Sequence, residues 1–216
     1  MARIRSKEEF TQTNEPQRQD DDNVPVKEVK TSTKDFCSIP DSIVKLLEKQ
    51  IAHEINNYTI YNTFAGYYKK EGMDDLCTYF RYRADEEREH AEWIQGFLES
   101  VNAKWTYPTI EGVNENITDP IHPFLRTIEV EKGTTKMINN LGVEALKAGD
   151  LITFQWLMDD EEDTGMLVKE QQEEEEISIA AYHIISDEEQ KWEKKEKAVL
   201  EHYLKATGKG EDKSKE

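Results

Sequence analysis

Apolar side chains recur at steps of three and four residues along most of the chain, which is the spacing of amphipathic helices. The first such stripe follows Pro40 and ends near Gly72, with Asp41 or Ser42 as the expected N-cap. Its members are Ile43, Leu47, Ile51, Ile55, Tyr58, Tyr61 and Ala65. A second stripe predicts a helix from about Asp74 to Val101. Two long helices separated by one glycine are therefore expected.

A long connection without helical periodicity follows the second stripe. Its breakers are Pro108, Gly112, Asn114, Asn116, Pro120 and Pro123. A connection of this length can carry the chain from one end of a bundle to the other. The second and third helices therefore need not form an antiparallel hairpin.

The second half of the chain contains further helical stripes. A third helix is expected from about Pro123 to Ala148, and a fourth begins near Asp150. The acidic stretch 159–165 is expected to interrupt the fourth helix or make it bulge. Residues 186–189 have the spacing of a capping box and are expected to open a short fifth helix. No strand pattern competes with these helices, so the fold class is all-α.

Composition divides the chain into three parts. Residues 1–38 are polar and predict a disordered extension, 39–206 hold the helical stripes, and 207–216 form a charged tail. No run of about twenty apolar residues is present, so no membrane association is expected. The basic N-terminus is not followed by an apolar stretch. This pattern favours a cytoplasmic location over secretion.

The charge balance is strongly acidic, with 46 Asp and Glu against 28 Lys and Arg and a formal net charge of -18. Nucleic-acid binding needs clustered basic residues, so nucleic acid is not an expected partner. An acidic chain attracts cations, although solubility alone also explains such a charge. Cys37 and Cys77 have no second cysteine at metal-binding or redox spacing.

Several polar residues interrupt the apolar stripes on the inward side of the predicted helices. One or more comes from each of the four long helices: Glu54; Glu87 and His90; Glu131; Gln171 and Glu174. Each residue alone has a simple interpretation as part of a solvated helix face. Together they predict a dinuclear carboxylate site, because buried carboxylates are costly unless they are paired or bind metal. Such ligands suit iron, manganese or zinc without selecting one of them.

The chain resembles the bacterial non-haem ferritins over roughly residues 43–185. The resemblance rests on four segments and their separations: Leu47–Glu54, Asp85–His90, Thr127–Glu131 and Glu170–Glu175. It implies a ferritin-like four-helix bundle with a long crossover between the second and third helices and a short C-terminal fifth helix.

The resemblance also implies a role for each matching residue. Glu54 and His90 would hold a first iron, Glu87 would bridge two irons, and Glu131 and Glu174 would hold the second. Gln171 would lie beside the centre as a hydrogen-bonding residue. The remaining matches are acids of a third iron site that shares Glu174, and a redox-active tyrosine: Glu86, Glu170, Glu173 and Tyr61.

The implied function is iron storage and detoxification. The implied enzyme is a ferroxidase that oxidises Fe(II) with dioxygen or hydrogen peroxide and deposits the product as mineral inside a homo-oligomeric shell of about twenty-four subunits. Two alternatives stay open: another di-iron or di-manganese carboxylate oxidoreductase, and a metal-free structural helical bundle.

Two departures from the family pattern affect these expectations. The fourth helix lacks a second Glu-x-x-His motif, so no haem is expected. About seven extra residues, close to two helical turns, lie between Phe154 and Glu170. A loop or a lengthened helix of that size could still bring Gln171 and Glu174 back into register.

Overall fold

The computed structural model describes residues 37–159 and 167–209, and their regular structure is entirely helical. Six helices occur in these two ranges: α1 (Asp41–Glu71), α2 (Asp74–Ser100), α3 (His122–Lys147), α4 (Leu151–Met158), α5 (Leu167–Ser186) and α6 (Trp192–Ala206). None of these helices combines the length and the apolar character that a membrane span requires. Most of the predicted extension and tail lies outside the described residues, so those predictions remain open.

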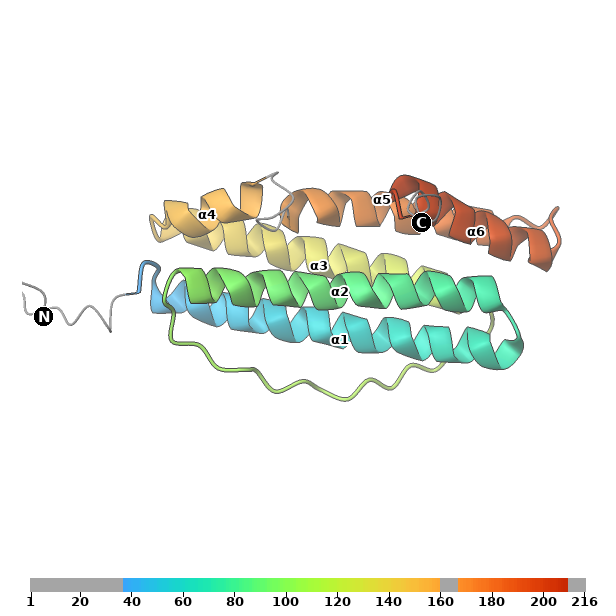
Figure 1. Ribbon diagram of the computed structural model, residues 1–216, viewed down its shortest axis with the longest axis horizontal. Coiled ribbons are helices and arrows are strands. Elements are labelled where there is room, and N and C mark those ends of the chain that lie inside the picture. Colours follow the sequence, from blue (N-terminus) through green and yellow to red (C-terminus); the bar gives the residue numbers. More distant parts are fainter. Residues whose placement is uncertain (1–36, 160–166, 210–216) are drawn as a thin grey trace, which may run out of the picture. The chain divides into compact units, whose positions relative to one another are not determined.

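Helices α1 and α2 form a long antiparallel hairpin (Figure 1). Gly72 ends α1 in the left-handed conformation with φ of 76°, and its N–H donates to the carbonyl of Lys69. Glycine takes this conformation without the steric cost that other residues meet. The predicted N-caps of α1 were wrong. Pro40 occupies that position, and Asp41 is the first helical residue, where its negative charge favours the helix N-terminus.

The connection between α2 and α3 runs along α1 from one end of the bundle to the other (Figure 1). Successive contacts tie it to α1: the Thr106 N–H donates to Glu48 at 2.9 Å, and Tyr68 donates to the Pro120 carbonyl at 2.6 Å. The crossover makes α2 and α3 run in the same direction (Figure 1), as the sequence had allowed. The predicted all-α bundle with a long crossover is therefore confirmed.

The predicted fourth helix consists of two helices. Gly149, with φ of 71°, turns the chain after α3, and the Asp150 carboxylate accepts from the Thr153 N–H at 3.0 Å to cap α4. Helix α4 ends at Met158, and Asp159 is extended. The interruption expected within 159–165 thus begins at its first residue, although residues 160–166 lie outside the described ranges.

The predicted capping box at 186–189 was wrong. Ser186 is the last residue of α5, and the Asp187 carboxylate accepts from the Glu189 N–H at 2.9 Å. The Asp187 side chain therefore stabilises a turn between α5 and α6 and does not cap a helix. Helix α6 begins only at Trp192. Helix α6 then packs against α2 and α5 through Val199 and Tyr203, which are fully buried.

Two apolar clusters form the core. One contains buried residues from Ile60 to Ala84 together with residues of α3, α5 and α6. The other contains buried residues from Ile39 to Ile51, from Ala91 to Val101, and from the ends of α3, α4 and α5. Between the two clusters lies a belt of buried polar side chains.

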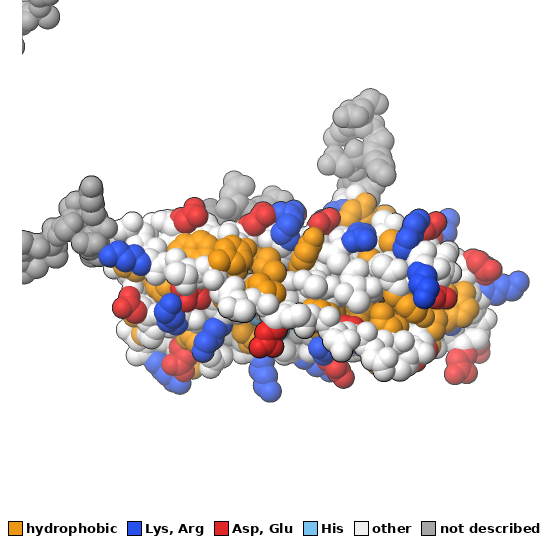
Figure 2. Space-filling view, turned by 90° about the horizontal axis from the view of Figure 1, so that it is seen from below, with side chains coloured by type: hydrophobic (Ala, Val, Ile, Leu, Met, Phe, Trp, Pro, Cys, Tyr) orange, Lys and Arg blue, Asp and Glu red, His pale blue; other side chains and the backbone are white. Residues whose placement is uncertain are grey.

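The space-filling view shows acidic and basic side chains intermixed on one face of the molecule (Figure 2), so the negative charge is not gathered there.

Candidate dinuclear metal centre

The six polar residues predicted to point inward all lie in the buried belt between the two apolar clusters. They are Glu54 on α1, Glu87 and His90 on α2, Glu131 on α3, and Gln171 and Glu174 on α5. None is more than 3% exposed. Despite the extra residues before α5, Gln171 and Glu174 are thus buried in the same belt as the other four residues. Helical periodicity alone was sufficient to identify this set.

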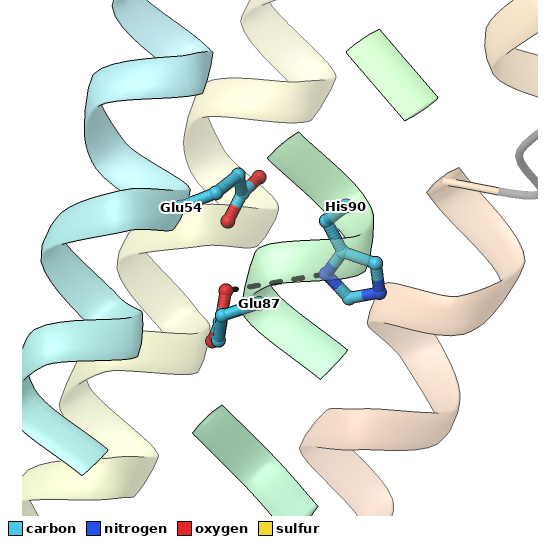
Figure 3. A group of neighbouring side chains, drawn as sticks. All are labelled: Glu54, Glu87 and His90. Atoms are coloured by element: carbon cyan, nitrogen blue, oxygen red, sulfur yellow. Dashed lines mark ion pairs between the residues drawn. The ribbon is translucent and has the colours of Figure 1, made fainter. Parts of the chain in front are cut away.

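The carboxylates and the imidazole form two groups that share one residue. Ligand atoms of Glu54, Glu87 and His90 all lie within 4.8 Å of one another, and the same holds for Glu87, Glu131 and Glu174. Figure 3 shows Glu54 from α1 facing Glu87 and His90 from α2. We call these groups the first triad (Glu54, Glu87, His90) and the second triad (Glu87, Glu131, Glu174). Two cations with Glu87 between them would match this arrangement.

The hydrogen bonds of the buried carboxylates indicate whether the site suits a cation. Gln50 donates to Glu54 at 2.7 Å and Asn57 donates to Glu87 at 3.3 Å. Within the described residues, the second oxygen of each of these two carboxylates is buried and accepts no hydrogen bond. One oxygen of Glu174 is likewise buried without a partner, and the other lies 3.1 Å from the Arg83 guanidinium. Buried carboxylate oxygens without partners are costly. Divalent cations bind such oxygens, so the donor set fits a metal site.

Burial changes the protonation of these groups in two directions. Burial raises the pKa of Glu54 to about 7. Burial, followed by the neighbouring Glu54 charge, raises the pKa of Glu87 well above its usual range. Burial also lowers the pKa of His90 to about 4. His90 is therefore neutral near pH 7 and one ring nitrogen offers a lone pair, while the raised pKa values of the two carboxyl groups follow first from their burial.

The predicted redox tyrosine lies directly beside the second triad. Tyr61 is fully buried and donates a hydrogen bond to Glu131. Gln171 donates to the other oxygen of Glu131 at 2.9 Å, in agreement with its predicted hydrogen-bonding position. Burial, followed by the Glu131 charge, raises the pKa of Tyr61 well above its usual value. The phenol therefore keeps its proton and orients Glu131.

Sequence reasoning missed Arg83, a fully buried arginine on α2. Its guanidinium lies 2.5 Å from Glu131 and 3.1 Å from Glu174. A signal was present, because Arg83 follows Phe80 by three residues and precedes Glu87 by four. That spacing places it on the inward stripe of α2. A charged residue on such a stripe needs a buried partner.

Sequence reasoning also missed two further polar residues that lie on an inward helix face. Gln50 and Asn57 lie four residues before and three residues after Glu54, on the same face of α1, and both are 1% exposed. Their amides orient the carboxylates of the first triad. His53 lies 2.8 Å from the Thr134 hydroxyl and belongs to neither triad.

Comparison with known proteins agrees with this geometry. The Ferritin family, described as a ferritin-like domain, matches residues 44–181. The chain belongs to the ferritin family. It is 27% identical over 124 residues to a bacterial non-heme ferritin of Campylobacter jejuni, covering 56% of this chain and 74% of that protein. It is 24% identical over 119 residues to ferritin BfrB of Mycobacterium tuberculosis, covering 54% and 66%.

Solved ferritin structures share the fold. An open pore ferritin from the archaeon Archaeoglobus fulgidus superposes with a TM-score of 0.68 at 23% identity, covering 76% of this chain and 97% of that one. A variant of PmFTN, from a crystal soaked in iron, superposes with a TM-score of 0.66 at 16% identity, covering 74% and 98%. These structures show the shared fold, and the family match over residues 44–181 confirms the resemblance that the motifs indicated.

The three additional acids of the predicted third site line one cavity together with Glu174. A cavity of about 340 Å³ is lined by Glu86, Glu170, Glu173 and Glu174, among others. Glu86 already accepts from Tyr203 at 2.6 Å and from Lys209 at 2.9 Å. Within the described residues these acids are not gathered as closely as the two triads. The third site therefore remains a prediction.

Proposed function

We propose that this chain is an iron-storing ferritin whose two triads bind a pair of Fe(II) ions as substrate and oxidise them. The observation that carries the proposal is the shared position of Glu87 between two buried triads that have unpaired carboxylate oxygens. Membership of the ferritin family supports iron as the metal. A di-manganese oxidoreductase would use similar ligands, and the metal content of the purified protein distinguishes the two.

The roles that we propose for the ligands are those that the family resemblance implies, and the shared position of Glu87 supports them. Glu54 and neutral His90 bind the first ion, Glu87 bridges, and Glu131 and Glu174 bind the second. Each Fe(II) gives up one electron, and the two electrons with two protons reduce dioxygen to hydrogen peroxide, or reduce a peroxide to water. Hard anionic oxygens favour the higher charge of Fe(III), so the carboxylates promote oxidation. Tyr61 keeps Glu131 oriented toward the second ion through its hydrogen bond.

We further propose that copies of the chain assemble into a shell that holds the oxidised iron, with about twenty-four subunits and a cytoplasmic location as in the sequence-based expectation. Exposed apolar side chains at the end of α3 and along α4 suit contacts between copies: Val143, Leu146, Leu151, Ile152 and Met158. No haem is included in the proposal. Measurement of the native mass by light scattering tests the assembly.

Aerobic addition of Fe(II) to the metal-free protein tests the chemistry. We expect the wild-type protein to form Fe(III) rapidly, as measured by absorbance. In Glu87→Gln the initial rate should fall by about two orders of magnitude, because both triads lose their shared anion. Glu92→Gln is the matched control, since Glu92 is on α2, with a side chain that is 57% exposed. Equal rates for wild type and Glu87→Gln would rule out the bridging role.

A further inference from the structure

Arg83 places a permanent positive charge inside the second triad. It is 0% exposed, and its guanidinium ion-pairs with Glu131 at 2.5 Å, with Glu174 at 3.1 Å and with Glu86 at 3.1 Å. Guanidinium does not lose its proton in proteins. Two of these three partners are the carboxylates that the second ion would need. Arg83 is therefore ion-paired with two of the three carboxylates of the second triad.

The first triad has no comparable partner. Within the described part of the chain, no Lys or Arg pairs with Glu54 or Glu87, whose hydrogen bonds come from the neutral amides of Gln50 and Asn57. One oxygen of each carboxylate is left without a partner. Among the described residues, no basic side chain is thus paired with Glu54 or Glu87, whereas the other two carboxylates of the second triad are paired with Arg83. The two halves of the centre are electrostatically unequal.

We propose that Arg83 is a built-in competitor for the second cation, so that the centre fills in two unequal steps. This inference rests on the proposed metal-binding function of the triads. A first ion enters the first triad, where no Lys or Arg of the described residues is paired with Glu54 or Glu87. A second ion binds Glu131 and Glu174 only when the guanidinium releases them, because two positive groups cannot share the same oxygens at these distances.

Glu86 provides the place to which the guanidinium can withdraw. It lies on α2 three residues after Arg83, one turn along the same helix, and is already in contact with it. Tyr203 and Lys209 hold the other oxygen of Glu86, so the carboxylate stays in place when Arg83 lets go of Glu131 and Glu174. The charge of Arg83 then remains paired after the second ion has bound. This arrangement makes release reversible without an unpaired buried charge.

Calorimetric titration of the metal-free full chain with Zn(II), which carries no redox chemistry, tests the proposal. We expect one ion to bind at least about tenfold more tightly than a second. In Arg83→Gln the second ion should tighten by about 10–100-fold while the first changes little. Arg88→Gln, an exposed arginine on the same helix, is the control and should match wild type.

Two further variants keep the test decisive if Arg83→Gln does not fold. Arg83→Lys retains the charge and should keep the unequal steps. Glu86→Gln removes the partner to which Arg83 withdraws and should weaken only the second ion. Two ions of equal affinity in the wild-type protein would overturn the role of Arg83 and leave the proposed function standing. Absence of Zn(II) and Fe(II) binding in both wild type and Arg83→Gln would overturn both.

Discussion

At the scale of single residues, the centre depends on neutral donors that hold carboxylates in place. Gln50, Asn57, Tyr61 and Gln171 each donate to one of the buried acids Glu54, Glu87 and Glu131. A positioned second partner fixes the direction in which the remaining oxygen points. The donors therefore determine which oxygens face the cation positions.

Tyr61 offers a direct test of this orienting role. In Tyr61→Phe we expect the free energy of unfolding of the metal-free protein to fall by about 1–3 kcal/mol, because a buried hydrogen bond to a charged acceptor is lost. Chemical denaturation measures this change. Tyr58→Phe is the control, since Tyr58 is partly buried on the same helix and its hydroxyl makes no hydrogen bond within the described residues. A loss of the same size in both variants would show that the ring, and not the hydroxyl, is responsible.

At the scale of elements, the crossover between α2 and α3 is the part of the bundle that most needs tertiary contacts. Its residues have no helix of their own, and Glu48 of α1 is one of the side chains that hold it. The two oxygens of Glu48 accept from the Thr106 N–H at 2.9 Å and from Lys45 at 2.6 Å. Burial alone would raise the pKa of Glu48, but the Lys45 and Thr106 contacts lower it below its usual value.

This lowered pKa makes the tether dependent on pH. The ordinary glutamate pKa is about 4.3, and a lower value in the folded state stabilises the protein above that pH. The contribution is lost as the pH falls through the folded-state pKa. We therefore expect the melting temperature of wild type to exceed that of Glu48→Gln near neutral pH, and the difference to shrink below about pH 4.

Thermal melts of both proteins across this pH range measure the effect. Glutamine keeps an oxygen that can accept from Thr106, so the substitution removes mainly the charge. Glu144→Gln is the control, because Glu144 pairs with Lys147 on the surface of α3. A difference that stays constant with pH would contradict the assignment to the Glu48 charge.

At the scale of the whole molecule, the buried acids of the centre destabilise the folded protein when no cation is bound. Four helices bring several carboxylates into one buried belt, and their mutual repulsion is relieved only in part by Arg83. A cation that binds the folded bundle and not the unfolded chain must stabilise the fold. We therefore expect the protein to be less stable without a bound cation than with one.

Addition of Zn(II) to the metal-free protein should raise its melting temperature. At a free concentration one hundred times the dissociation constant, the stabilisation is about 2.7 kcal/mol. In Glu87→Gln the increase should be much smaller, whereas Glu92→Gln should behave as wild type. Calorimetry with and without a chelator measures both. A similar increase in all three proteins would place the bound ion outside the two triads.

The sequence by itself determined the helices and the inward acids. Steps of three and four residues place Glu54, Glu87, His90 and Glu131 on apolar faces, and this relation is local, because neighbouring turns of one helix fix it. The motif order within residues 43–185 was sufficient to identify the family. The sequence did not determine that the predicted fourth helix is divided into α4 and α5, since the register of α5 depends on residues outside that helix.

Only the tertiary structure decided how charges are paired. The two mistaken caps, at Asp41 and Ser186, arose because several local partners compete for a helix end and packing selects one of them. Arg83 was overlooked because an arginine on a helix face is usually solvated, and only the approach of α3 and α5 surrounds it with Glu131 and Glu174. Helical spacing is a property of one segment, whereas the balance of buried charge belongs to all the helices that meet around it.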